Sequence, residues 1–495
     1  MTTPLPTGVD ARTPVIVGAG QINDRDFGSE PIDLMARCTE AALDDSGRPA
    51  ELRAVLDSVR VVWGVWPYRD PGRLVADRIG APTARTALTN VGGNQVYDQT
   101  IRTASLVAAG EIDAAVVCAA ESLRTRRADR ARGERTEYLP ERDGAAPDEP
   151  VDPEREHFSE AEKAVELDNA VRFYAMAESA LRHRLGEDVA SHRRRIAELW
   201  AGASGVAADN PHAWLRTELT ADEIAHESDR NRPVAAPYPK LLTSNLNVDQ
   251  GGSVIICAAE VADRCGIPRD RWVFPWSGAR ATDHWFPTNR WALDESPAMR
   301  LSGESALELG GIGVDDAAII DLYSCFPIAV QVAQRELGIS ADRPFTITGG
   351  LTFAAGPLNC YCILALTRAV ELLRTAPHET AFLTGNGGMF TKHSAMVLSG
   401  GPAEHGFRTA HPQSQVDALP SRPTPGTPAA EGVLEAYTVT FDREMQPERA
   451  ILAVLDDRGA RHWAQSSHRP ALDAMLADDC CGRSVELDGT DALLA

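Results

Sequence analysis

A glycine turn in the first quarter of the chain has the residue types and spacing of a ligand site. The short apolar run Ala87–Val91 predicts a buried strand, Gly92 and Gly93 interrupt it, and Gln95–Gly110 has the apolar spacing of a helix. Such a turn lies at the carboxyl edge of a parallel sheet, where backbone N–H groups and the positive helix end point outward. The sequence therefore predicts a ligand at this turn, although a glycine pair that only permits positive φ explains the pattern equally well.

A cluster of arginines follows in a strongly acidic chain. The stretch from Leu123 to Arg135 includes Arg124, Arg126 and Arg127, whereas the whole chain has a formal net charge of −22. An acidic protein that binds an anion must concentrate its cations locally, and such a cluster suits phosphate groups. A solvated loop accounts for the same composition, so both interpretations stand.

The nine cysteines predict reduced thiols, because their number is odd and several have apolar neighbours. Cys360-Tyr361-Cys362 and the pair Cys480-Cys481 lack a second His or Cys pair at zinc spacing. No metal is therefore expected.

The composition excludes several classes of function. With 495 residues, 43% hydrophobic and 24% charged, the chain is typical of a globular protein of two to four units. Its negative charge argues against binding to nucleic acid or anionic lipid. No apolar run reaches membrane-spanning length, and the start Thr2-Thr3-Pro4 lacks the basic region of a signal peptide, so we expect a cytoplasmic protein.

Two similar α/β halves are predicted to position these residues, each with the order strand, glycine turn, helix, strand. Strands of the first half are expected at Pro14–Gly20, Val59–Val65, Ala87–Val91 and Ile112–Ala119, and its helices at Ile32–Ser46, Arg73–Ile79 and Gln95–Gly110. Strands of the second half are expected at Ala317–Tyr323, Ala381–Gly385 and Ala395–Ser399, and its helices at Ser305–Leu309, Phe326–Leu337 and Cys362–Leu373.

Composition divides the chain into five segments. They are a first half (1–122), an insertion with one or two helices over Phe173–Trp200 (123–238), a return segment with the second half (239–405), a linker rich in Pro, Ser, Thr and Gly (406–428), and a small β-rich unit (429–495). The size of the last unit suits a small barrel, but a short meander fits its pattern as well.

Asn90, Glu121 and Ser122 resemble the nucleophile segment of the thiolase superfamily, in which a strand runs into Asn-x-x-Cys and the next strand ends in Glu-Ser. The resemblance covers about residues 12–400. It implies an α/β thiolase fold of two similar βαβαβ halves in five layers, with an inserted loop domain that covers the nucleotide end of CoA. The chain is most similar to sterol-carrier-type thiolases and to thiolase-like proteins labelled acetyl-CoA acetyltransferases that carry a C-terminal extension.

The positions that carry thiolase chemistry hold other residues here. Gly93 stands at the nucleophilic cysteine, Tyr323 at the first residue of the Asn-Glu-Ala-Phe or His-Asp-Cys-Phe motif, Gly356 at the histidine of Gly-His-Pro, and Thr384 at the second cysteine. Glycine has no atom that can hold an acyl group. The surrounding glycines remain, and the resemblance implies that Gly387 and Gly388 are candidates for an oxyanion hole.

Further candidates follow from the resemblance. The segment Leu241–Arg264 resembles the stretch that lines the pantetheine channel, which leaves Ser244 and Asn247 as polar CoA contacts, although a helix N-cap explains either. Cys325 or Cys360 could serve as a relocated nucleophile with His393 as base. Packed thiols and a structural histidine are the alternative.

These observations predict a thiolase-like protein that binds CoA or acyl-CoA, uses no prosthetic group and is unable to perform ordinary thiolysis. Two alternatives are an active acyltransferase with a relocated nucleophile and a non-catalytic partner of another acyl-CoA protein. Whether the chain is an enzyme, and whether it is a homodimer or a monomer, are left open by the sequence.

Overall fold

The computed structural model describes residues 5, 9–151, 155–426 and 428–494. The start Thr2-Thr3-Pro4, on which the expectation about a signal peptide depends, lies outside the described residues. So do 152–154 of the acidic segment and 427 of the predicted linker. Among the described helices, none has the length and apolar character that a membrane crossing requires.

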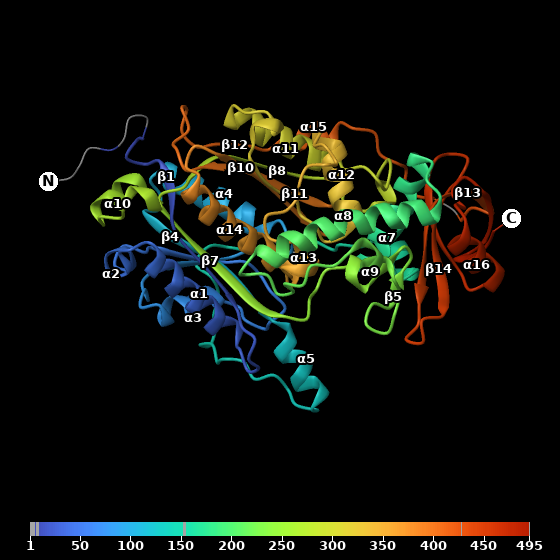
Figure 1. Cartoon of the computed structure of the whole chain (residues 1–495), viewed down its shortest axis with the longest axis horizontal. Helices are drawn as coiled ribbons and strands as arrows, with labels where there is room; N and C mark the ends of the chain where they lie inside the picture. Colours follow the sequence, from blue (N-terminus) through green and yellow to red (C-terminus); the bar gives the residue numbers. More distant parts are fainter. Residues whose placement is uncertain (1–4, 6–8, 152–154, 427, 495) are drawn as a thin grey trace.

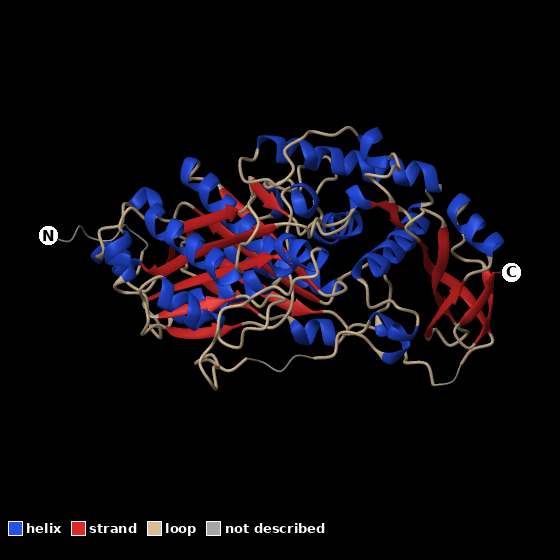
Figure 2. Ribbon diagram, turned by 90° about the horizontal axis from the view of Figure 1, so that it is seen from below, coloured by secondary structure: helices blue, strands red, loops and turns tan. Residues whose placement is uncertain are grey.

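Two five-stranded sheets form the centre of the molecule (Figures 1 and 2). The first has the order β1-β7-β4-β2-β3 and the second the order β12-β8-β11-β10-β9. The strands of the first are β1 (Pro14–Asn23), β2 (Ser58–Val61), β3 (Arg85–Leu88), β4 (Ala114–Ser122) and β7 (Asp249–Ala258). Those of the second are β8 (Phe274–Thr282), β9 (Ile319–Asp321), β10 (Thr380–Gly387), β11 (Lys392–Ser399) and β12 (Arg408–Ala410).

Helices separate the sheets and cover their outer faces, which gives five layers. Helices α4 (Gln95–Ala108) and α14 (Tyr361–Thr375) contact both sheets from between them. Helices α1 (Pro31–Asp45) and α3 (Pro71–Arg78) pack on the first sheet, and α11 (Pro297–Gly310) packs on the second. Helix α12 (Pro327–Leu337) packs against α11. Every residue of β4, β7, β10 and β11 is buried, as strands covered on both faces require.

The remaining helices connect these layers or belong to the insertion. They are α2 (Pro49–Arg53), α5 (Leu123–Ala131), α6 (Glu160–Ala164), α7 (Ala170–Leu185), α8 (Val189–Asp209), α9 (Ala221–Ala225), α10 (Ala259–Arg264), α13 (Gly350–Phe353), α15 (Gln413–Asp417) and α16 (Arg469–Ala477). Short 3₁₀ turns lie at Lys240–Leu242, Arg269–Arg271, Pro287–Asn289, Val314–Asp316 and Leu358–Cys360.

The return segment contains a strand where an N-cap role for Ser244 or Asn247 would require a helix. Asp249–Ala258 is strand β7, which pairs antiparallel with both β1 and β4. Its glycines serve close packing: a Cβ on Gly251 would lie 2.8 Å from Cβ of Ala120, and one on Gly252 would lie 2.9 Å from Ile363. An N-cap role for Ser244 or Asn247 is therefore wrong, because the first helix after them, α10, begins only at Ala259.

The C-terminal unit is a closed barrel and not a meander. Its strands β13 (Glu431–Phe441), β14 (Pro447–Leu455), β15 (Arg461–Ser466), β16 (Ser484–Asp488) and β17 (Asp491–Leu494) pair in the ring β13-β14-β15-β17-β16-β13. The barrel has its own apolar core, which includes Leu434, Leu452 and Leu472. Two short strands of the insertion, β5 (Pro233–Ala235) and β6 (Tyr238–Pro239), extend the sheet through β13.

The segment predicted as a linker is folded onto the second sheet. Strand β12 runs parallel to β8, and helix α15 follows it. Val416 is buried against Ala281 and Ala298, and the side chain of Gln413 accepts a hydrogen bond from the backbone N–H of Thr282. The composition of this segment is that of a linker with few contacts to its neighbours. These two side chains and the pairing of β12 with β8 nevertheless attach it to the second sheet.

The acidic segment after α5 caps the open edge of the first sheet at β3. The carboxylate of Asp148 accepts a hydrogen bond from the backbone N–H of Thr86, at 2.8 Å, and the N–H of Glu149 donates to the carbonyl of Thr86, at 3.0 Å. The Glu149 carboxylate also pairs with the buried guanidinium of Arg60. Such a cover keeps an edge strand from pairing with another chain.

Candidate functional site

The turn that begins α4 has no room for a side chain. A Cβ added to Gly93 would lie 2.2 Å from the hydroxyl oxygen of Tyr323 and 2.5 Å from the carbonyl oxygen of Asn386, both far below contact distance. The backbone N–H of Gly92 donates to the side-chain amide oxygen of Asn359, which holds the turn. The phenol of Tyr323 therefore fills the space that a residue larger than glycine would need at this turn.

The four positions that align with thiolase motifs lie in one buried cluster. The hydroxyl of Thr384 accepts a hydrogen bond from the backbone N–H of Tyr323, at 3.1 Å. The ring of Tyr323 meets that of Tyr361 edge to face, with centroids 5.6 Å apart. Tyr361 in turn closes the space at Gly356, where an added Cβ would lie 2.8 Å from Cβ of Tyr361. The resemblance to thiolase motifs predicted these four positions, but nothing in the sequence indicated that Tyr361 would join them.

The thiols near this cluster are poor nucleophiles. Burial raises the pKa of Cys325 to about 12 and that of Cys360 well above its usual value. Burial likewise raises the pKa of Tyr323. The side-chain amide of Asn386 donates to the hydroxyl of Tyr174 and lies 4.0 Å from the sulfur of Cys325. These groups all keep their protons near neutral pH.

The glycines proposed for an oxyanion hole lie in a turn that is held through their carbonyl groups. Gly387 ends β10 opposite Lys392, and its carbonyl accepts a hydrogen bond from the N–H of Thr391. The carbonyl of Gly388 accepts a hydrogen bond from the hydroxyl of Tyr174, at 2.9 Å. The structure thus places both glycines beside the cluster, in a tight turn.

His393 lines a hollow of about 180 Å³ beside the start of α4, together with Asn90, Gln95 and Arg280. Its Nε2 lies 2.9 Å from the carbonyl oxygen of Phe390 and 2.9 Å from the hydroxyl of Ser296. A carbonyl oxygen only accepts, so Nε2 carries the proton and cannot take one from Ser296. The serine itself donates to Asp283 and caps α11, which makes the group structural.

The predicted arginines diverge along α5. The guanidinium of Arg124 lies 3.8 Å above the ring of Phe27 and 5.8 Å from that of Trp214. The guanidinium of Arg25 also lies over the Trp214 ring, 4.5 Å from its centroid. The side chain of Arg126 instead donates to the carbonyl of Val65, and Arg127 is exposed. We call Arg25, Phe27, Arg124 and Trp214 the arginine–aromatic rim; of these, the sequence indicated only Arg124.

The chain segment 244–248 connects this rim to the buried cluster, with one hydrogen bond at each end. The N–H of Arg124 donates to the carbonyl of Val248, directly after the exposed Asn247. Further along the segment, the hydroxyl of Ser244 donates to the carbonyl of Cys325, at 2.9 Å. The structure therefore places Arg124, Asn247, Ser244 and Cys325 along one path.

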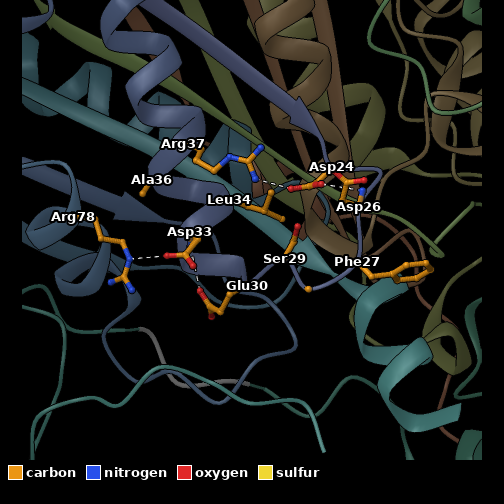
Figure 3. Close-up of a pocket in the computed structure, with 11 residues that line it drawn as sticks. Asp24, Asp26, Phe27, Ser29, Glu30, Asp33, Leu34, Ala36, Arg37 and Arg78 are labelled. Atoms are coloured by element: carbon orange, nitrogen blue, oxygen red, sulfur yellow. Dashed lines mark hydrogen bonds and ion pairs between the residues drawn. The ribbon is translucent and has the colours of Figure 1, made fainter. Parts of the chain in front are cut away.

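An open pocket of about 660 Å³ lies on the other side of Phe27 (Figure 3). Four carboxylates line it, against two arginines that are already paired: Arg37 with Asp24 at 2.6 Å, and Arg78 with Asp33 at 2.8 Å. In Figure 3 the Phe27 ring lies apart from these ion pairs, toward α5. This pocket is unsuited to phosphate, which leaves the rim as the cationic side of the loop.

Glu121, at the end of β4, is fully buried, and one of its oxygens accepts the N–H of Val65 while the other has no partner among the described residues. Burial raises its pKa to about 8, so folding requires a proton that an unfolded carboxylate releases above about pH 4.5. Stability should therefore be lost as the pH rises from about 4.5 to 8, by roughly a few kcal/mol. Glu121→Gln should flatten this dependence in denaturant unfolding, because an amide cannot ionise.

The exposed Glu111, just before the same strand, provides the control for this prediction. Glu111→Gln should leave the pH dependence unchanged. A Glu121→Gln profile identical to that of the unmodified protein would show that the Glu121 carboxyl ionises as readily when folded as when unfolded.

Comparison with solved structures identifies the fold. The chain matches a structure described as a monomeric SCP2-thiolase-like protein type 1 from Mycobacterium smegmatis, with a TM-score of 0.84 and 29% identity over 98% of this chain and 100% of that one. The chain has the thiolase fold and is similar to thiolase-like proteins of type 1. The predicted thiolase fold with a C-terminal β-rich domain is thereby confirmed.

Residues 412–491 of this thiolase-like chain match the family described as the thiolase-like protein type 1 additional C-terminal domain. Two further structures share the fold. Human mitochondrial 3-ketoacyl-CoA thiolase has a TM-score of 0.56 and 13% identity, over 79% of this chain and 99% of that one. An Ltp2-ChsH2(DUF35) aldolase has a TM-score of 0.61 and 18% identity, over 78% of this chain and 97% of that one. Among curated proteins, the benzoylsuccinyl-CoA thiolase subunit BbsB of Thauera aromatica is 28% identical over 135 residues. That match spans only 27% of this chain and 32% of the subunit.

Proposed function

We propose that this thiolase-like protein binds CoA or an acyl-CoA and does not perform ordinary thiolysis. The path from the arginine–aromatic rim past Asn247 and Ser244 to Cys325 carries the proposal. It combines cations for the phosphates at one end with a buried, closed cluster at the other. Two relatives are named for CoA thioester substrates, which is consistent with such a ligand.

At the rim, we assign Arg124 and Arg25 to the phosphates and the exposed ring of Phe27 to the adenine. Phe27 is 59% exposed, so its ring is accessible to a ligand. A base can stack on this ring as Arg124 does now. The pantetheine arm would then run along Asn247 and Ser244.

Arg124→Ala should weaken the binding of CoA by at least about tenfold, because a hydrogen bond to a charged group contributes about 1.5–3 kcal/mol. Binding of pantetheine, which has no nucleotide, should be unchanged. Calorimetric titration with both ligands tests this. Arg130→Ala, an exposed arginine in the last turn of the same helix, is the matched control.

Equal loss of CoA and pantetheine binding in Arg124→Ala would move the phosphate site elsewhere. A variant that also replaced Arg126 would mix binding with stability, because the Arg126 side chain donates to the carbonyl of Val65.

An active acyltransferase with a relocated nucleophile remains the alternative, with Cys325 or Cys360 as acyl carrier. The raised pKa of both thiols speaks against it. The third interpretation, a partner of another acyl-CoA protein, would be tested by co-purification.

We also infer that the chain is a monomer, because Asp148 and Glu149 occupy the free edge of β3. Size-exclusion chromatography with light scattering should give a mass near 53.3 kDa. A dimer that persists on dilution would contradict this inference.

A further inference from the structure

Three side chains from opposite ends of the sequence converge where the insertion meets the C-terminal barrel. His183 lies in the last turn of α7, whereas Asp479 and Cys481 lie in the loop between α16 and β16. Nδ1 of His183 is 2.6 Å from a carboxylate oxygen of Asp479. The nitrogen, oxygen and sulfur of the three residues all lie within 4.8 Å of one another. In the part of the chain that the structure describes, no other such cluster occurs.

We propose that His183, Asp479 and Cys481 bind a zinc ion. One imidazole nitrogen, one carboxylate oxygen and one sulfur form a mixed ligand set that suits Zn²⁺, and three protein ligands leave a fourth tetrahedral position for water. An ion can reach the site from solvent, because the His183 side chain is half exposed. Cys481, by contrast, is buried. The spacing of the cysteines alone predicted no metal, since His183 and Asp479 are 296 positions apart.

Neighbouring groups hold the ligands in place. The other oxygen of Asp479 accepts hydrogen bonds from Arg182, at 3.1 Å, and from the backbone N–H of Cys481, at 3.2 Å. These contacts leave the oxygen nearest His183 directed at the cluster, as outer contacts do for metal ligands. Gly482 lies beside the imidazole, where an added Cβ would come 3.7 Å from the ring.

The ion would join the end of α7 to the barrel. The contacts between Arg182, Tyr437 and Asp479 already connect these two units. A bound zinc would replace the direct contact between His183 and Asp479 and add a bond to the sulfur of Cys481, whose thiol proton would be released to solvent. We infer a structural role, because the cluster lies on α7 and the barrel, away from the turn at Gly93.

Titration of the chelator-treated full-length protein with Co²⁺ tests the proposal, because a cobalt–thiolate bond gives a charge-transfer absorption band. We expect one equivalent to produce the band, Cys481→Ser to abolish it, and Cys480→Ser to retain it. Cys480 is a buried thiol adjacent in sequence that does not join the cluster, which makes it the matched control.

Zinc analysis of the purified protein gives a second readout. One zinc per chain in the unmodified protein and its loss in Cys481→Ser would support the site. No zinc and no thiolate band, or an unchanged band in Cys481→Ser, would overturn it. If Cys481→Ser does not fold, His183→Gln alters only a half-exposed ring; its cobalt affinity should fall at least tenfold, and an unchanged affinity would also overturn the proposal.

Discussion

Thiolysis of acetoacetyl-CoA by the unmodified protein should be about 10⁶-fold slower than by a thiolase with its cysteine, since loss of the nucleophile alone costs an acyl-transfer enzyme about that much. Gly93 offers no thiolate, and Gly356 and Thr384 offer no histidine or second cysteine. Spectrophotometric consumption of acetoacetyl-CoA in the presence of CoA measures the rate. Robust turnover that is lost in Cys325→Ala or Cys360→Ala would instead identify a relocated nucleophile.

Restoring the cysteine should not restore the reaction. The new Cβ of Gly93→Cys overlaps the hydroxyl of Tyr323 and the carbonyl of Asn386, so we expect destabilisation by about 1–3 kcal/mol and no acyl adduct. The filled space at the turn leaves no room for an acyl group on the new cysteine.

A double-mutant cycle provides the control. Gly93→Cys should cost less stability in a Tyr323→Asn background, where the nearer overlap is gone, than in the unmodified protein. Equal costs in both backgrounds would show that the phenol does not limit the space at position 93.

The second large effect concerns the attachment of the barrel. Arg461, fully buried on β15, donates to the carbonyls of Pro287, Thr288 and Arg290 and forms two hydrogen bonds with Glu435. Arg461→Ala leaves three carbonyls without their donor and leaves the Glu435 carboxylate with only Arg422, at 3.5 Å; breaking a buried ion pair costs about 3–5 kcal/mol. Denaturant unfolding should show this loss, whereas Arg469→Ala, in an exposed ion pair, should cost less than about 1 kcal/mol.

Deletion of 408–495 should accordingly destabilise the rest of the chain. It removes β12 from the second sheet and leaves buried Arg182 without Tyr437 and Asp479. A soluble truncated protein that melts near the full-length temperature, together with an unaffected Arg461→Ala, would show that the barrel is attached only loosely.

Local patterns predicted the two α/β halves well. An apolar run such as Ala381–Gly385, followed by paired glycines, predicts a strand and the turn after it. The residues that give this signal are close together in the sequence, so no distant contact is needed to recognise it. The strand β8, at Phe274–Thr282, was missed, because its Pro275 and Gly278 interrupt the apolar run.

Features that depend on distant contacts could not be predicted. Barrel closure requires β13 to pair with β14 and β16, and the short strand β17 has a polar start. Similarly, nothing in the sequence brings Tyr323 to Gly93 or Trp214 to Arg124, since each pair meets only after folding. The cluster at the turn and the arginine–aromatic rim therefore required the structure.

Isothermal calorimetry tests the central claim most directly when acetoacetyl-CoA is injected first without CoA, to measure binding, and then with CoA, to measure turnover. We predict injection heats that saturate at one ligand per chain and then return to baseline. Injections without binding heat would contradict the CoA site, and thermal power sustained until the substrate is consumed would contradict the loss of thiolysis.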